Sequence, residues 1–457
     1  MNQFNNLVKN FINKKKLILY LFGCLIFLNF LIPPFQSPDD FNHFKRAYLL
    51  TEGEFVLKKY NLNTGGEIDN GLLDYMNLHS KIPFNKNEKY TTEMFNKGKG
   101  IKWQTEKSFS GLANIAPYFP LTYLPQAGAI MFGKFFNLSI DQTYKISRFV
   151  LLFSVLATLI IANKIWPIPY PNKIILLLPM PIFLFGSSHP DIFLWAILFL
   201  ILSCTFRLMG FIDRYKKMDL IIFFAILFFI FLLVSNRVIY AGLYLIPIYI
   251  CFKSKNYSQL ISILVFICTN LYWLYLSELN HGPINIDYET INSIRHLPEH
   301  IPTFLSSIYT NLILSFGFYK RMLFSFIGNL GWLDAKLYSW LYYFYIICLV
   351  ILYKKFTIYL QPKTYKIIDY FLLFISVSSF CLLYVATFIK WIPIDTEKIR
   401  LQGRYLYPML FIIFYMNKFI PSPNFYKSKF FTVKLPLMLF LVSFFVVLLR
   451  VLTRYYI

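Results

Sequence analysis

Two adjacent carboxylates, Asp39 and Asp40, follow the first apolar segment of the sequence, and His43 comes one helical turn later. A carboxylate in such a position can act as a general base that takes a proton from an acceptor hydroxyl. If a helix begins after Pro38, the i, i+4 and i+7 spacing places Asp39, His43 and Arg46 on one face. Asp39 is then the natural helix cap, and Asp40 is freer to act as the base. The structural alternative is that both acids only end a helix and face solvent.

The same residues also allow a metal site. Asp40 and His43 could hold a divalent cation, although the sequence shows no third ligand beside them. His296 and His300 have i, i+4 spacing but lack the His-Glu-x-x-His order, and Pro298 interrupts the helix that would align them. We therefore predict no dedicated metal site and no cofactor, with a cation near Asp40 and His43 as the alternative.

A second candidate cluster lies near the end of the chain, in the segment Gln402–Pro408. Arg404 presents a planar fork of donors that suits a phosphate group, and Gly403 lets a ligand approach the backbone closely. Lys390 and Arg400 make the preceding loop basic, which suits an anionic lipid head. The alternative is that Arg404 anchors a helix end at the membrane interface, beside Tyr405 and its neighbours.

The elements that position these residues are predicted to be membrane helices. The chain has 457 residues, of which 57% are hydrophobic and 20% aromatic, and its mean hydropathy is +0.53. Leu17–Ile32 is an uncharged run that spans roughly 24 Å as a helix. Continuous runs of this kind argue against an outer-membrane barrel, whose strands alternate. We predict about eleven crossings, the first at Leu17–Ile32 and the others at 142–162, 173–188, 190–209, 219–235, 237–252, 258–277, 337–353, 367–388, 405–420 and 433–451.

The net charge of +23 could suggest nucleic acid as a partner, but its distribution does not. The basic clusters lie in short links between apolar runs, which is the positive-inside pattern of a membrane protein attracted to anionic lipids. This pattern predicts a cytoplasmic N-terminus. Residues 34–136 then form a first outer loop with juxtamembrane helices, in which 117–136 does not cross, and 278–336 forms a second outer region.

This topology brings the polar residues of the apolar segments to the outer side. All six histidines fall there, together with Asp191, Arg237, Asp334 and Arg404. The stretches Ser187–Asp191 and Gly328–Asp334 are interpreted as structural turns. The six cysteines lie within apolar runs and indicate neither disulfides nor zinc. Phosphate-binding glycine loops and the G-x-S-x-G nucleophile motif are absent from the sequence.

Four motifs in this order resemble the signature of a large bacterial family of polytopic membrane proteins of unknown function, which are of the GT-C glycosyltransferase kind. They are Pro33–Tyr48, Pro190-Asp191, Gly331–Asp334 and Gln402–Tyr405. That family usually has Asp-Glu where this chain has Asp39-Asp40. The shorter second acid leaves open which of the two is the base.

The resemblance implies an all-α polytopic membrane protein with a GT-C-like bundle of about 11 (10–13) transmembrane helices. It also implies one membrane-embedded domain over residues 1–457, a catalytic acid in the first outer loop, and a sugar donor carried on polyprenyl phosphate. Such a protein lies in the cytoplasmic membrane of a bacterium, with its active site on the outer face.

On this basis we expect an inverting transfer of the sugar to a surface glycan or glycolipid. Asp40 or Asp39 would be the base. The residues expected to bind substrate or lipid phosphate are His43, Arg46, Lys390, Arg400, Arg404 and Tyr405. The alternatives are a flippase or transporter of lipid-linked glycans, which would need charges deep within helices, and a polysaccharide polymerase.

Overall fold

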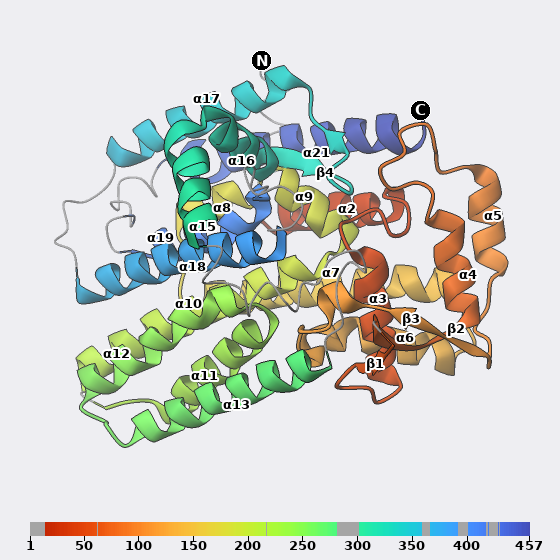
Figure 1. The fold of residues 1–457 in the computed structure, drawn as a ribbon. Helices are drawn as coiled ribbons and strands as arrows, with labels where there is room; N and C mark the ends of the chain where they lie inside the picture. Colours follow the sequence, from red (N-terminus) through yellow and green to blue (C-terminus); the bar gives the residue numbers. More distant parts are fainter. Residues whose placement is uncertain are drawn as a thin grey trace, which may run out of the picture.

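The computed structural model describes residues 14–61, 63–215, 217–280, 301–358, 366–391, 401–416, 419, 428 and 430–457. Within these ranges the protein is mainly helical, with long helices packed side by side (Figure 1). Six of the described helices are long and apolar enough to cross a membrane. They are α7 (Ile140–Ile165), α10 (Pro190–Tyr215), α13 (Gln259–Leu279), α17 (Ser339–Ile358), α18 (Ile367–Trp391) and α21 (Leu435–Tyr455).

A seventh crossing is formed if a bent pair of helices counts as one span. The first arm comprises α15 (Ile301–Ile308) and η5 (Tyr309–Leu314), and the second is α16 (Phe316–Gly328). The two arms meet at 76° after a single-residue break at Ser315. Further apolar helices are shorter: the Tyr20–Leu31 part of α2 (Lys14–Leu31), α11 (Leu220–Asn236), and η3 (Val238–Tyr244) with α12 (Leu245–Ser254).

The predicted number of about eleven crossings is therefore wrong for the described chain, which has six or seven candidates. The run 173–188 is divided between α8 (Tyr170–Ile175) and α9 (Pro179–Ser187), and every residue of α9 is buried by other helices. The described part of the run 405–420 is divided between the end of a short turn, η6 (Gly403–Leu406), and α19 (Tyr407–Ile413). Hydropathy measures how apolar a run is, and it does not distinguish a helix surrounded by protein from a helix surrounded by lipid.

The polar region after α2 folds into a small subdomain around its own apolar core. It contains α3 (Asp40–Thr51), α4 (Asn70–His79), α5 (Thr92–Gly100), η1 (Ala113–Ile115), η2 (Pro120–Tyr123) and α6 (Leu124–Phe135). It also contains an antiparallel sheet in the order β1 (Lys58–Tyr60), β2 (Asn63–Asp69), β3 (Lys107–Gly111). A strictly all-α fold does not include this sheet, or the short hairpin of β4 (Asn329–Leu330) and β5 (Ala335–Lys336). The candidate membrane spans are α-helices, as predicted.

Two features of this subdomain bear on the site. The helix α6 has 12 residues, fewer than the ~20 that a crossing needs, and it packs against α3 and α7. The core of the subdomain includes Phe35, Phe44 and Tyr144, so it joins α3 to the first turns of α7. Of the predicted second outer region, 281–300 lies outside the described residues.

Candidate functional site

The start of α3 holds the first acid in an unusual backbone conformation. Asp39 is the residue before the helix and has φ 59°, in the left-handed region, which Asp tolerates better than most residues. Its side chain makes no capping hydrogen bond, so the expected cap role is wrong. Instead, Asn114 Nδ2 donates to Asp39 Oδ1 over 2.8 Å, and Asn42 Nδ2 donates to Asn114 Oδ1 over 2.7 Å. This chain of amides fixes the orientation of the Asp39 carboxylate.

The second acid points toward different partners. Asp40 is 6% exposed, whereas the Asp39 side chain is 40% exposed. The Tyr144 hydroxyl donates to Asp40 Oδ2 over 2.8 Å and accepts from the backbone N–H of Phe35. Burial raises the pKa of Asp40 to about 6, although the Arg148 guanidinium and the Tyr144 hydroxyl act in the opposite direction. Asp40 is therefore a buried group that joins α3 to α7.

Two arginines from distant parts of the chain face the Asp39 side of α3. Arg237, between α11 and η3, donates to Asp191 Oδ1 at 2.5 Å. Arg404, in η6, has its Nε 3.8 Å from Asp191 Oδ2 and its Nη2 3.9 Å from Asp39 Oδ2. The ring of Tyr405 lies beneath both guanidinium groups, 4.7 Å from Arg237 and 5.1 Å from Arg404. We call these five residues the acid–arginine cluster.

The guanidinium of Arg404 is buried but incompletely bonded. The residue is 3% exposed, and its two carboxylate neighbours are beyond hydrogen-bond distance. Its Nη2 donates to the Tyr405 hydroxyl over 3.2 Å, but its Nε and Nη1 have no hydrogen-bond partner among the described residues. Buried donors normally have partners, so the unused donors of Arg404 are available to a water molecule or an anion.

Close packing of η6 against α16 fixes the position of Arg404. The N–H of Gly403 donates to Ser325 Oγ over 2.6 Å, and the Tyr407 hydroxyl donates to the Phe326 carbonyl over 2.7 Å. A Cβ atom on Gly403 would lie only 2.1 Å from the backbone N of Phe326. Glycine is therefore needed here for contact between two backbones, whereas the sequence had suggested contact with a ligand.

Two buried histidines complete the wall beside Asp39. The His43 Nδ1 is 2.7 Å from the Tyr123 hydroxyl, and its ring stands at 86° to that of His189, with centroids 5.2 Å apart. The His189 Nε2 donates to the Pro38 carbonyl, and its Nδ1 accepts from the N–H of Asp191, as suits a neutral ring. Burial lowers the pKa of His43 to about 4. Both rings therefore act as neutral hydrogen-bonding groups near pH 7.

The structure brings some of the predicted site residues together and not others. Asp39, His43, Arg404 and Tyr405 meet in one place, with Asp40 behind Asp39. Arg46 is fully buried, and its guanidinium donates to the carbonyls of the 54–55 loop. These contacts make Arg46 an anchor of that loop. Arg400 lies outside the described residues, and so does the side chain of Lys390.

Several members of the site were not selected from the sequence. Asp191 was interpreted as part of a turn, but it bonds Arg237 within the cluster. Asn114 and Tyr144 orient the two acids and had no distinguishing motif. The usable signal was the placement of Asp191 and Arg237 at the ends of long apolar runs, where a charge needs a partner.

The structure does not bring Asp40 and His43 to a common point. Asp40 faces Tyr144, and His43 faces Tyr123. In the described part of the chain, no group of three or more His, Cys, Asp or Glu side chains has an arrangement that could hold a metal ion. Asp334, from the Gly331–Asp334 motif, lies away from the cluster and pairs with Arg454 over 2.6 Å.

The family described as predicted membrane proteins (DUF2142) matches residues 22–413. The chain belongs to this family. The match contains the whole acid–arginine cluster and confirms the resemblance to a family of membrane proteins of unknown function. No curated protein and no solved structure matches. The resemblance to GT-C glycosyltransferases stays a prediction.

Proposed function

We propose that this DUF2142 protein is a glycosyltransferase that moves a sugar from a polyprenyl-phosphate carrier to a hydroxyl of a cell-surface glycan or glycolipid. The observation that carries the proposal is the Arg404 guanidinium, which is buried, retains two unused donors and lies 3.9 Å from the half-exposed Asp39 carboxylate. An anion-binding group beside a possible base is the arrangement needed for a transfer in which a phosphate leaves.

In the proposed reaction the acceptor hydroxyl attacks the anomeric carbon of the donor sugar. The new C–O bond forms as the bond from that carbon to the phosphate oxygen breaks, and the phosphate departs with the electron pair. The acceptor proton passes to Asp39. Attack opposite the leaving group inverts the anomeric centre. Arg404 neutralises the departing phosphate through a paired set of N–H donors, and Arg237 adds a second positive charge behind it.

The geometry favours Asp39 over Asp40 as the base. Asp39 faces the cluster and is 40% exposed, so a hydroxyl can reach it. Asp40 is buried and accepts from the Tyr144 hydroxyl of α7, so its carboxylate is turned away from the cluster. We therefore assign to Asp40 a positioning role, in which it holds the start of α3 against α7. This reverses the preference drawn from the sequence, which depended on a side-chain cap that Asp39 does not make.

The membrane location fits a lipid-borne donor. The cluster draws on residues of α10 and η6 and on Arg237 beside η3, all of which lie among apolar helices, and on Asp39 from the polar subdomain that holds α3. We propose that the boundary between the apolar helices and the polar subdomain lies at the outer face of the bacterial cytoplasmic membrane. A polyprenyl chain would lie there in lipid, and the acceptor would arrive from water. The positive-inside distribution of basic residues supports this orientation.

The test is a comparison of envelope glycans in a strain from which the gene is deleted. Mass spectrometry of the surface glycan should show the loss of one sugar, and the lipid extract should show an accumulated polyprenyl-phosphate sugar. A plasmid with the wild-type gene should reverse both changes. Plasmids with Asp39→Asn or Arg404→Ala should not reverse them at matched protein levels in the membrane.

A suitable control is Lys97→Gln, because Lys97 forms an exposed pair with Glu93 on α5. This variant should restore the glycan fully. Full restoration by Asp39→Asn and Arg404→Ala would refute the transferase proposal. A flippase would be indicated if the strain accumulated complete lipid-linked glycan and both variants restored its export.

A further inference from the structure

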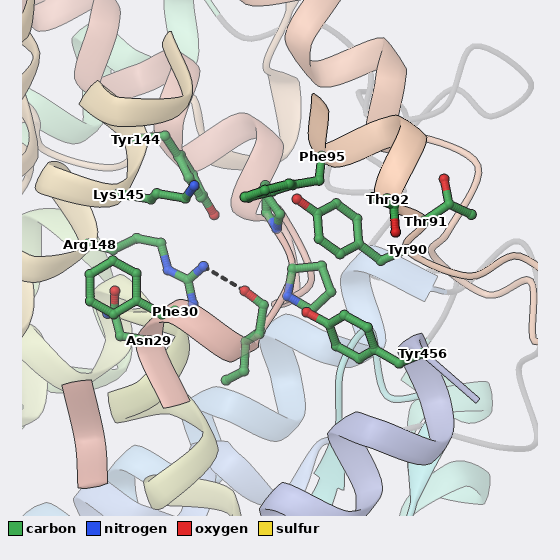
Figure 2. A pocket seen from close by; sticks show the side chains of 13 residues that line it. Asn29, Phe30, Tyr90, Thr91, Thr92, Phe95, Tyr144, Lys145, Arg148 and Tyr456 are labelled. Carbon is green, nitrogen blue, oxygen red and sulfur yellow. Dashed lines mark hydrogen bonds between the residues drawn. The ribbon is translucent and has the colours of Figure 1, made fainter. Parts of the chain in front are cut away.

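A cavity of about 470 Å³ lies beside Tyr144, none of the five residues of the acid–arginine cluster lines it, and the proposed transfer does not use it. Its walls are the end of α2 with Pro33 and Pro34, the first turn of α5, the first turns of α7, and Tyr456 near the end of the chain (Figure 2). Tyr144 separates this cavity, which we call the α2–α7 pocket, from Asp40.

The pocket is lined by cations and by no acid among its 13 described lining residues. Lys145 and Arg148 project from one face of α7 toward the pocket (Figure 2). Arg148 is 5% exposed and donates to the carbonyls of Ile32 and Gly186, but its Nε has no hydrogen-bond partner among the described residues. The Lys145 ammonium also pairs with Asp141 over 2.7 Å, and the Tyr75 hydroxyl donates to the other oxygen of that carboxylate.

The opposite wall of the pocket adds positive potential. Thr91 caps α5 by accepting from the N–H of Met94, and Thr92 is the first residue of that helix. Both threonines line the pocket (Figure 2), so the positive end of the α5 dipole borders it. The acid in the first turn, Glu93, is not among the lining residues; its side chain is 73% exposed and pairs with Lys97.

The remaining boundary of the pocket is apolar and continues along the helices. Phe30 lines the pocket and is 62% exposed. Farther along the adjacent helix α7, Phe149 and Phe153 are exposed, and Phe149 packs against Phe22 of α2 with ring centroids 6.3 Å apart. Because α7 is a candidate span, exposed aromatic residues along it contact lipid chains.

From this arrangement we infer that the α2–α7 pocket binds the phosphate head group of a membrane lipid, with the hydrocarbon chain lying along the exposed aromatic residues of α2 and α7. The lipid is recognised by two cations and a helix N-terminus at one end and by apolar surface at the other. This site is separate from the phosphate site proposed at Arg404. Its ligand is either a polyprenyl phosphate or an anionic phospholipid, which share this chemistry.

The test uses the full-length protein in detergent and native mass spectrometry. The probes are a polyprenyl phosphate, phosphatidylglycerol and the uncharged polyprenol. An Arg404→Gln background removes the other proposed phosphate site. In that background both phosphorylated probes should bind more tightly than polyprenol. Lys145→Glu should weaken that binding by about 10- to 30-fold, and Lys145→Gln by about fivefold.

The matched control is Lys134→Glu. Lys134 pairs with Glu52 over 2.6 Å and lies over the Tyr48 ring, much as Lys145 pairs with Asp141 and lies over the Phe95 ring, but Lys134 does not line the pocket. Binding by this variant should equal that of the parent protein. Preference for polyprenyl phosphate would identify the carrier lipid as the ligand, and equal binding of phosphatidylglycerol would identify bulk anionic lipid. Unchanged binding in both Lys145 variants, or equal binding of polyprenol, would overturn the inference.

The outcome is distinguishable from the outcome for the proposed function. If the pocket inference fails, the Lys145 variants bind the phosphorylated probes normally, while Asp39→Asn still abolishes transfer. If the transferase proposal fails, Asp39→Asn keeps the wild-type glycan, while the Lys145-dependent binding of phosphorylated lipid remains.

Discussion

The two adjacent acids at the start of α3 should separate into a chemical role and a positioning role. Asp39→Asn is a mild change in structure. Asparagine also tolerates the left-handed backbone at this position, and its side-chain oxygen can still accept from Asn114. It cannot take a proton from an acceptor hydroxyl. We expect transfer to fall by about 10²- to 10⁴-fold, with the amount of folded protein unchanged.

The effect of Asp40→Asn should be on stability and should depend on pH. Burial raises the pKa of Asp40 to about 6, so the folded protein takes up this proton at a higher pH than the unfolded chain does. Stability therefore rises as pH falls through 6 toward 4, and above pH 6 the buried carboxylate costs roughly 2–3 kcal/mol. Asparagine carries no such charge. The variant should be at least as stable as wild type at pH 8 and lose this advantage by pH 4.5.

Both variants can be measured in parallel. Transfer is followed by the glycan complementation assay at matched membrane levels, and apparent Tm is followed in detergent at pH 4.5 and 8. Wild-type transfer in Asp39→Asn together with a dead but stable Asp40→Asn would refute the assignment from exposure and orientation. A Tm difference between Asp40→Asn and wild type that does not vary with pH would refute the account of the buried carboxylate.

Three further predictions follow from the geometry. Arg404→Lys should reduce transfer by at least about tenfold at unchanged protein level, because an ammonium group is a point charge and lacks the paired donors; a wild-type kcat/KM for the lipid donor would contradict this. Gly403→Ala should lower apparent Tm sharply, because its Cβ would meet the α16 backbone at 2.1 Å, whereas Gly128→Ala, with no atom within 4 Å, should not. In a cysteine-free background, single cysteines at Lys97 and Asn137 should both react with an impermeant reagent from the outer side, and labelling from opposite sides would show that 117–136 crosses.

The polar residues of the site could largely be predicted from the sequence, because charge is rare in an apolar chain. Asp39, His43 and Arg404 were selected individually on this basis, and they meet in the structure. The contacts between them could not be predicted. Asp191 and Arg237 are 46 positions apart, and nothing in their local sequence indicates that they bond. Local patterns report which residues need partners, and only the packing of helices determines which partners they find.

The number of crossings was not predictable from hydropathy for a related reason. The apolar runs before Asp191 and after Tyr405 fold into short helices that are buried by other helices. A helix buried in protein is as apolar as one that crosses the membrane, so hydropathy counted both runs as spans. The strands β1, β2 and β3 were also missed. They are short, and β1 is wholly exposed, so a strong alternation of apolar and polar residues is absent.

The backbone around the acids suggests why the site has its present form. Phe35, Asp39 and Ser188 all have φ between 55° and 60°, a conformation that costs roughly 1–2 kcal/mol for such residues. Each of the three residues is held by hydrogen bonds. Phe35 donates its N–H to the Tyr144 hydroxyl and accepts at its carbonyl from Trp332, and Asp39 accepts from Asn114. The Ser188 hydroxyl accepts from Asn29 of α2 and donates to the Arg148 carbonyl. These turns direct the Asp39 carboxylate toward Arg404, whereas a regular cap would turn it back onto its own helix. Contacts from α2, α7 and the turn between β4 and β5 thus maintain a conformation that the local sequence alone disfavours, and the result is an acid held close to a cation without a direct bond between them.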